Sequence, residues 1–194
     1  MKTEFFGERV LLAMAVLGAL TLAGCTTVRV YTDFDPAANF HSYKTFAWHP
    51  GPQMATGNER IDNPLLVKRI RQGVTRQLQI QGYVESGAST ADMLVGYHIS
   101  LDKKLSVTTV NDYYGYGHRG YGSWGRGMGT RHTYVNEYEM GTLIIDLVDR
   151  RQNELVWRGS GESRLSKHPT PEKTDKKVAE VVSAILAKFP PSKK

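Results

Sequence analysis

Leu143-Ile144-Ile145-Asp146-Leu147-Val148 is the stretch that decides the fold class of this 194-residue chain. Nearly every position in it is apolar, whereas a strand with one face in water would be apolar only at every second position. The run therefore predicts a central β-strand, covered on both faces. Its β character begins at about Thr133, where Tyr134 and Val135 follow.

Further strands are predicted on both sides of this run. Apolar and polar residues alternate over 93–107, and 154–159 begins a last strand. Two early segments, 28–34 and 44–48, show the same period of two, and 83–85 is a short candidate. In the first of these, alternation predicts a half-buried strand.

Two helices are predicted from apolar residues spaced three or four apart. The first runs from about Asn63 to Gln81, and the second opens at Thr170 and ends before 189–191. Each begins with a capping side chain followed by proline, an arrangement typical of helix N-termini. The apolar residues of the two helices are Leu66, Ile70, Val74 and Leu78, and Val178, Val181, Val182, Ile185 and Leu186.

The order β-β-α-β-β-β-β-α does not alternate strand and helix, so a parallel doubly wound sheet is not expected. The economical solution is an α+β fold. We expect a mostly antiparallel sheet of about five to six strands with two helices packed on one face. Residues 28–191 are long enough for one such domain.

The amino terminus has the layout of a secretory signal peptide over residues 1–24. Its apolar core, residues 10–20, is too short to span a bilayer and lacks a cationic stop-transfer flank. Leu22-Ala23-Gly24-Cys25 resembles the signal for prolipoprotein processing. The resemblance implies cleavage between Gly24 and Cys25, lipidation of Cys25, and a short tether over 25–27.

This anchor predicts where the chain resides. Stable anchoring needs two or more acyl chains, which lipoprotein processing would supply at Cys25. Thr26, by resemblance to lipoprotein sorting, points to the outer membrane, with the domain facing the periplasm. Cys25 is the only cysteine, so no thiol remains for a disulfide or a nucleophile. The net charge of +6 either attracts anionic envelope polymers or only aids solubility.

A set of short motifs resembles the bacterial lipoprotein family called domain of unknown function 4136. The resemblance covers about residues 26–190 and implies an exported, often lipidated envelope domain without assigned catalytic residues. The motifs that carry it are Asp33-Phe34-Asp35 with Phe40, 43–48, Gly82-Tyr83, 91–95, Gly141-Thr142-Leu143, 155–159 and Phe189-Pro190-Pro191.

The glycine-rich stretch 111–131 is the candidate binding segment, expected at the tip of a hairpin. Aromatic rings among glycines can stack on sugars, and arginines can pair with phosphate. An envelope protein or glycan is the expected partner, and nucleic acid does not suit a periplasmic location. The alternative is a low-complexity loop without a dedicated ligand. The candidate residues are Tyr113, Tyr114, Tyr116, Arg119, Tyr121, Trp124 and Arg126.

No motif in the chain indicates an enzyme, a cofactor or a metal site. The six histidines lack the spacing of metal ligands, and Asp33, Asp35 and Asp92 resemble turn or strand-end residues. We therefore expect a non-enzymatic binding or structural module. One alternative is a periplasmic hydrolase with a cleft around Asp33, Asp92 or His98. The other is a subunit of an envelope transport or assembly complex, which requires an exposed apolar patch or sheet edge.

Overall fold

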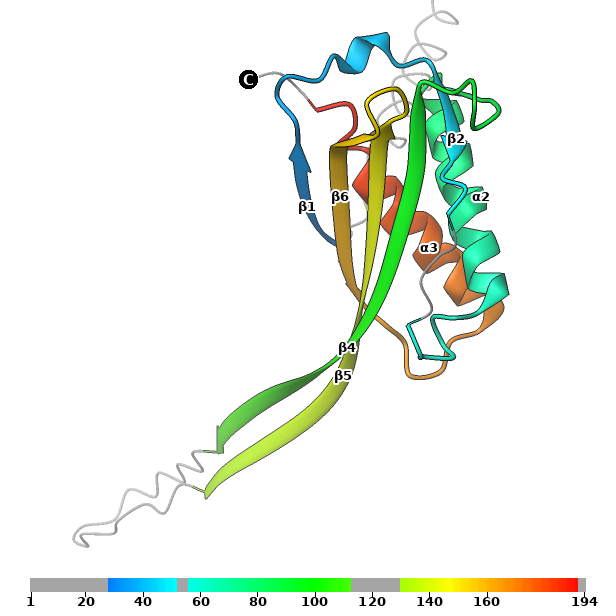
Figure 1. Ribbon diagram of the computed structural model, residues 1–194. Coiled ribbons are helices and arrows are strands. Elements are labelled where there is room, and N and C mark those ends of the chain that lie inside the picture. Colours follow the sequence, from blue (N-terminus) through cyan, green and yellow to red (C-terminus); the bar gives the residue numbers. More distant parts are fainter. Residues whose placement is uncertain (1–27, 52–55, 113–129, 192–194) are drawn as a thin grey trace, which may run out of the picture.

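The computed structural model describes residues 28–51, 56–112 and 130–191 (Figure 1). The order of strands and helices is the one expected from the sequence, with one additional short 3₁₀ helix. The elements are β1 (Arg29–Phe34), η1 (Phe40–Ser42), β2 (Thr45–Trp48), α2 (Pro64–Ile80), β3 (Val84–Glu85), β4 (Met93–Asp112), β5 (Thr130–Asp149), β6 (Glu154–Arg164) and α3 (Pro171–Leu186).

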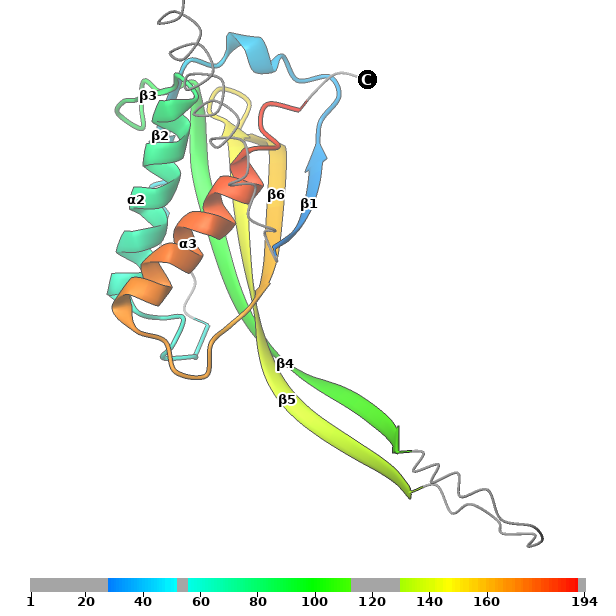
Figure 2. The ribbon, with the colours of Figure 1, turned by 180° about the vertical axis from the view of Figure 1, so that it is seen from behind.

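The strands form one six-stranded sheet in the order β1-β6-β5-β4-β2-β3. The pairs β1–β6, β6–β5 and β5–β4 are antiparallel, whereas β2 runs parallel to both β4 and β3. The parallel pairing follows from the long crossover between β2 and β4, which includes α2. Both helices cover the same face of the sheet (Figure 2). The predicted α+β class is confirmed.

The central run of β5 lies in the middle of this sheet. Its side chains at Leu143, Ile145 and Leu147 are buried beneath the helices. On the uncovered face Asp146 is buried, while Ile144 and Val148 are only half-buried. The prediction of a strand covered on both faces is therefore right for the helix side and only partly right for the other.

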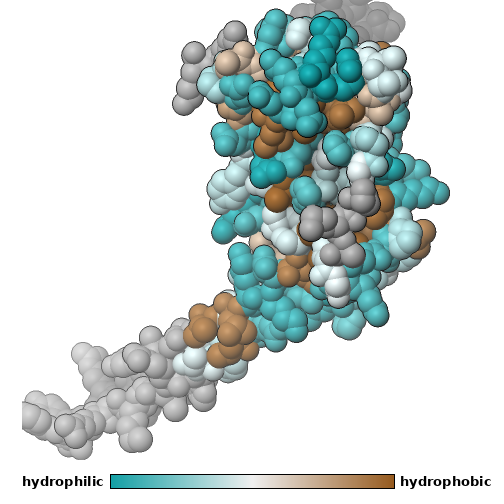
Figure 3. Space-filling view, in the orientation of Figure 1, coloured by the Kyte–Doolittle hydropathy of each residue, from teal (hydrophilic) through white to brown (hydrophobic). Residues whose placement is uncertain are grey.

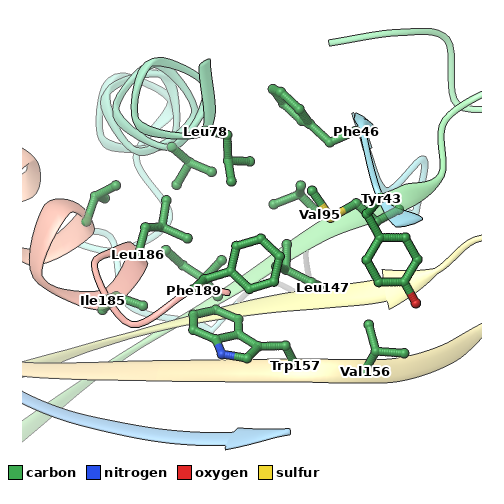
Figure 4. Close-up of a cluster of buried hydrophobic side chains, with 14 of the residues drawn as sticks. Tyr43, Phe46, Leu78, Val95, Leu147, Val156, Trp157, Ile185, Leu186 and Phe189 are labelled. Atoms are coloured by element: carbon green, nitrogen blue, oxygen red, sulfur yellow. The ribbon is translucent and has the colours of Figure 1, made fainter. Parts of the chain in front are cut away.

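Trp157 on β6 is the largest fully buried side chain (Figure 4). The register of β5 and β6 shifts so that Leu147 faces Trp157 and Val148 faces Leu155, which leaves Val156 as an additional residue. Such a bulge allows adjacent residues to enter one core, and Val156 and Trp157 are both buried in it. The Phe189 ring packs against Trp157 with centroids 5.3 Å apart.

The capping predictions for both helices are confirmed. The Asn63 side chain accepts a hydrogen bond of 2.9 Å from the Leu65 amide, and Thr170 Oγ1 accepts one of 3.3 Å from the Lys173 amide. Proline occupies the first turn of each helix. Beyond α2, Gly82 has a φ of +92°, a conformation that other residues rarely adopt.

The first strand is more exposed than its alternation predicted. Val28 and Val30 are half-buried, but Phe34 is 41% exposed. The reason is that β1 is the outermost strand and pairs only with β6. Alternation therefore identified the strand but not how far the helices extend over it.

Strands β4 and β5 extend well beyond the body as a two-stranded arm, defined as residues 103–112 and 130–139 (Figure 1). The expected loop 111–131 is wrong at its ends, because Asn111 pairs with Arg131 and Asp112 with Thr130. The consecutive β-branched residues at 107–110 favour continued strand here. Apolar side chains gather where the arm leaves the body (Figure 3), and Leu105, Val107 and Val135 are each at least 59% exposed.

Candidate binding pocket

A pocket of about 740 Å³ lies between the sheet and the N-terminal halves of α2 and α3. This volume falls in the range of roughly 300–1,000 Å³ typical of small-molecule sites. The pocket forms because the two helices begin at the same end of the sheet, near the base of the arm, where Ile99 and Leu101 of β4 form part of its wall.

The interior of the pocket is mainly apolar. Its apolar side chains come from two strands, both helices and the segments that precede α2 and α3. They are Ile61, Leu66, Ile70, Ile99, Leu101, Leu143, Leu165, Val178 and Val181. An interior of this kind favours an apolar ligand through the hydrophobic effect.

Ser163 provides a polar group in this apolar surface. Its side chain is only 2% exposed, and its Oγ has no hydrogen-bond partner among the described residues. A buried hydroxyl is normally paired, since leaving it unpaired costs about 1–3 kcal/mol. Ser163 lies on β6 opposite Gly141, with its side chain on the face that the helices cover, and it lines the pocket. Its hydroxyl is thus positioned to bond to a polar atom of a ligand.

The mouth of the pocket is basic. Six cationic residues line the pocket, against one acidic residue, Glu180. Three of the cations form ion pairs, Arg60 with Glu139, Arg69 with Asp175 and Lys177 with Glu180. The other three lining cations are Arg164, Lys173 and Lys176.

Sequence reasoning did not identify this pocket. The sequence shows basic residues on the first predicted helix, but they resemble an ordinary solvated helix face. The small residues Gly141, Gly161 and Ser163 were the available signal. They lie on two neighbouring strands, and Gly141 pairs directly with Ser163. Whether these small residues leave space for a pocket depends on the strand register, which the sequence did not specify.

The residues expected to form a binding loop lie outside the described residues. This applies to Tyr113, Tyr114, Tyr116, Arg119, Tyr121, Trp124 and Arg126. The signal peptide 1–24, the Gly24–Cys25 cleavage site and the tether 25–27 also lie outside them. Among the helices that the structure describes, none combines the length and the apolar composition needed to cross a bilayer.

Two of the residues proposed for a hydrolytic cleft, Asp33 and His98, lie beside one ion pair, that of Arg158 and Asp146. None of Asp33, Asp92 and His98 lines the large pocket. His98 lies on the uncovered face of the sheet, with Nε2 3.7 Å from Oδ2 of Asp146. Arg158 donates two hydrogen bonds to Asp146, of 2.6 and 2.7 Å, and this contact raises the pKa of Arg158. Asp146 is thus engaged in an ion pair that ties β5 to β6.

Asp92 joins the start of β4 to β2. Its Oδ2 accepts hydrogen bonds of 2.9 Å from the amides of Lys44 and Thr45 and from Thr45 Oγ1. The Lys44 amide, with smaller contributions from Thr45 and against the opposing effect of burial, lowers the pKa of Asp92. This is the strand-end role expected from the sequence. No group of three His, Cys, Asp or Glu side chains that could hold a metal occurs in residues 28–51, 56–112 and 130–191.

Asp92→Asn is expected to destabilise the domain by about 1–3 kcal/mol at neutral pH, because an amide cannot accept all three hydrogen bonds. Since the folded-state pKa is lowered, the contribution of Asp92 is complete above its unfolded value of roughly 3.9. It is lost as the pH falls below that value through the folded-state pKa. Urea unfolding at neutral and acidic pH measures this: the difference between variant and wild type shrinks below about pH 4.

The exposed Asp102→Asn on β4 serves as the control, with little expected change. Coincident unfolding curves for wild type and Asp92→Asn at neutral pH would contradict the prediction.

Together the fold and the pocket define an α+β domain with a mixed six-stranded sheet, two covering helices and an apolar site beneath them. The chain belongs to the family described as "Domain of unknown function (DUF4136)", which matches residues 30–191. This confirms the family predicted from the motifs. No curated protein matches the chain.

Two solved structures are similar to this chain. A PDZ domain protein from Parabacteroides distasonis has a TM-score of 0.50 at 13% identity, over 87% of this chain and 38% of that one. The chain therefore corresponds to less than half of that protein's length. The PelC dodecamer from Paraburkholderia phytofirmans has a TM-score of 0.48 at 11% identity, over 86% of this chain and 99% of that one.

Proposed function

We propose that this protein is a non-enzymatic binding module of the bacterial envelope, held at the membrane by lipid on Cys25. Its ligand is an elongated apolar molecule that enters the pocket between the sheet and the two helices. The pocket, with its apolar lining and its volume of about 740 Å³, is the observation that carries the proposal. The motifs at Leu22–Cys25 support the anchor.

Binding rather than catalysis is favoured by the chemistry of the lining. Among the described residues, the lining contains no histidine, cysteine or aspartate, and its one carboxylate, Glu180, pairs with Lys177 at 2.8 Å. General acid–base catalysis needs a titratable group within hydrogen-bond reach of the reacting atoms. The described part of the pocket instead offers apolar surface, the Ser163 hydroxyl and cations.

The test is photolabelling of the full chain in lipid nanodiscs with hexadecanol that carries a diazirine group. Mass spectrometry then locates the labelled residues. We expect labels at pocket-lining residues such as Ile99 and Leu101. Val178→Trp fills the space beside α3 and is expected to lower this labelling roughly tenfold, equivalent to about 1.4 kcal/mol.

The matched control is Val84→Trp, since Val84 is 61% exposed and does not line the pocket. Its labelling is expected to equal that of wild type. Circular dichroism confirms that both variants fold. Labels distributed over the surface, without enrichment at the pocket, would reject the proposed site.

The arm favours a second candidate function, that of a subunit in an envelope transport or assembly complex. Leu105, Val107 and Val135 are exposed on a ribbon whose strands pair only with each other. Isolated two-stranded ribbons are marginally stable in water, and unpaired strand edges tend to recruit further strands. The arm therefore has the exposed apolar side chains and strand edges that we expected of a transport or assembly subunit.

A further inference from the structure

We propose that the ligand of the pocket is an amphipathic lipid with an anionic headgroup. The acyl chain occupies the apolar interior, and the headgroup lies at the mouth beside Lys173 and Lys176. This inference rests on the proposed function, because it specifies the ligand class of the same pocket. Nothing in the family description assigns a ligand.

The balance of charge at the mouth is the first observation. After Arg60, Arg69 and Lys177 have been paired with carboxylates, Arg164, Lys173 and Lys176 remain without an ion-pair partner among the described residues. The Arg164 guanidinium lies 4.6 Å from the centroid of the Tyr138 ring, which leaves its charge unneutralised. Arg164 and Arg158 lie six residues apart on β6, so the Arg164 side chain lies on the uncovered face of the sheet. An anion at the mouth would therefore find two cations without a carboxylate partner among the described residues, Lys173 and Lys176.

The position of these lysines on α3 is the second observation. A helix N-terminus carries a partial positive charge, so acidic residues stabilise its first turns and basic residues destabilise them. The first two turns of α3 contain two acidic residues, Glu172 and Asp175, and three lysines, Lys173, Lys176 and Lys177. Asp175 is paired with Arg69, and Lys177 is paired with Glu180. The first turn of α2, which also borders the pocket, contains no acidic residue.

Only Lys173 lies in the first turn, where a positive charge opposes the helix dipole. Lys176 lies four residues after Glu172, a spacing that stabilises a helix. A bound anion would interact favourably with both lysines and with the N-termini of the two helices.

The Ser163 hydroxyl is the third observation. It is buried, has no hydrogen-bond partner among the described residues, and lines the pocket on the face of the sheet that the helices cover. It can donate a hydrogen bond to an ester or headgroup oxygen of a ligand. The pocket thus combines apolar surface, a buried hydroxyl and exposed lysines, the groups that would bind an amphipathic anionic lipid.

The experiment compares two photoreactive probes with the same chain, hexadecanol and hexadecyl phosphate, on the full chain in phosphatidylcholine nanodiscs. We expect the phosphate to label the pocket at roughly tenfold lower concentration than the alcohol. In the double variant Lys173→Glu/Lys176→Glu this preference should disappear, while labelling by the alcohol is retained. Both lysines are exposed, so the domain should fold.

The matched control is Lys68→Glu/Arg76→Glu, which changes the net charge by the same amount on an exposed face of α2 outside the pocket. It should keep the preference for the phosphate. Equal labelling by the two probes in wild type, or a preference that persists in the α3 variant, overturns the inference but leaves the proposed function intact. Failure of both probes to label the pocket rejects the proposed function itself.

A free fatty acid and an anionic phospholipid share this chemistry. Photoreactive palmitic acid and photoreactive phosphatidylglycerol form the two further arms of the experiment. Labelling of the pocket by phosphatidylglycerol identifies a membrane lipid as the source, and labelling by palmitic acid alone identifies the single-chain acid. The inference fails if neither labels the pocket more strongly than hexadecanol.

Discussion

Gly159→Ala is expected to destabilise the domain by about 3 kcal/mol, at the upper end of the usual cost of overpacking a core. A Cβ atom at this position would lie 2.4 Å from Cη2 of Trp157 and 2.6 Å from Cγ2 of Ile185. Both neighbours are fully buried and have little space in which to move (Figure 4). Relief requires the Trp157 ring to shift within the core as well as α3 to move away from β6, and urea unfolding measures the loss.

Gly96→Ala is the matched control, since it places the same methyl group on a strand of the same sheet. There the nearest atom to the new Cβ is Cβ of Asp146 at 3.7 Å, an ordinary contact. We expect a change between zero and a gain of about 1 kcal/mol, because alanine restricts the unfolded chain. Equal unfolding midpoints for the two variants would show that α3 does not pack on β6 as closely as described.

Cys25→Ser is expected to abolish lipid attachment, the largest single effect that we predict. Lipidation requires the thiol, and each buried methylene contributes about 0.8 kcal/mol to membrane affinity, so several chains make anchoring effectively permanent. Cells grown with alkynyl palmitate report attachment on a gel. Mass spectrometry of the purified wild-type amino terminus should find acylated Cys25.

Thr26→Ser keeps the cysteine and provides the control, in which labelling should persist. An unacylated wild-type amino terminus, or continued palmitate incorporation in Cys25→Ser, would reject the anchor and the envelope location that depends on it. The pocket test would be unaffected, because it concerns the folded domain alone.

Local sequence signals predicted most of the fold. Asn63-Pro64 and Thr170-Pro171 marked the helix starts because capping involves only neighbouring residues. The run 143–148 identified the central strand, because its composition reflects burial by the rest of the domain. Family membership followed from short motifs distributed along the chain.

The arm and the pocket could not be predicted, because both depend on where the covering layer ends. Val107 continues the alternation of Val95, yet Val95 is 1% exposed and Val107 is 64% exposed. A period of two in the apolar residues indicates a strand, but it does not indicate whether a helix covers that strand. The pocket likewise depends on the space between the sheet and the N-terminal halves of α2 and α3, and no local pattern encodes that space.

The pairing of the first strand with the last one affects the order in which the domain can be built. Arg29 on β1 lies opposite Glu162 on β6, so a protein synthesised from its amino terminus must wait for nearly its whole length before β1 can pair. During that time β1 has no strand to pair with. Closure of the sheet at this edge is therefore a late step, and cleavage at the predicted Gly24–Cys25 site can precede it.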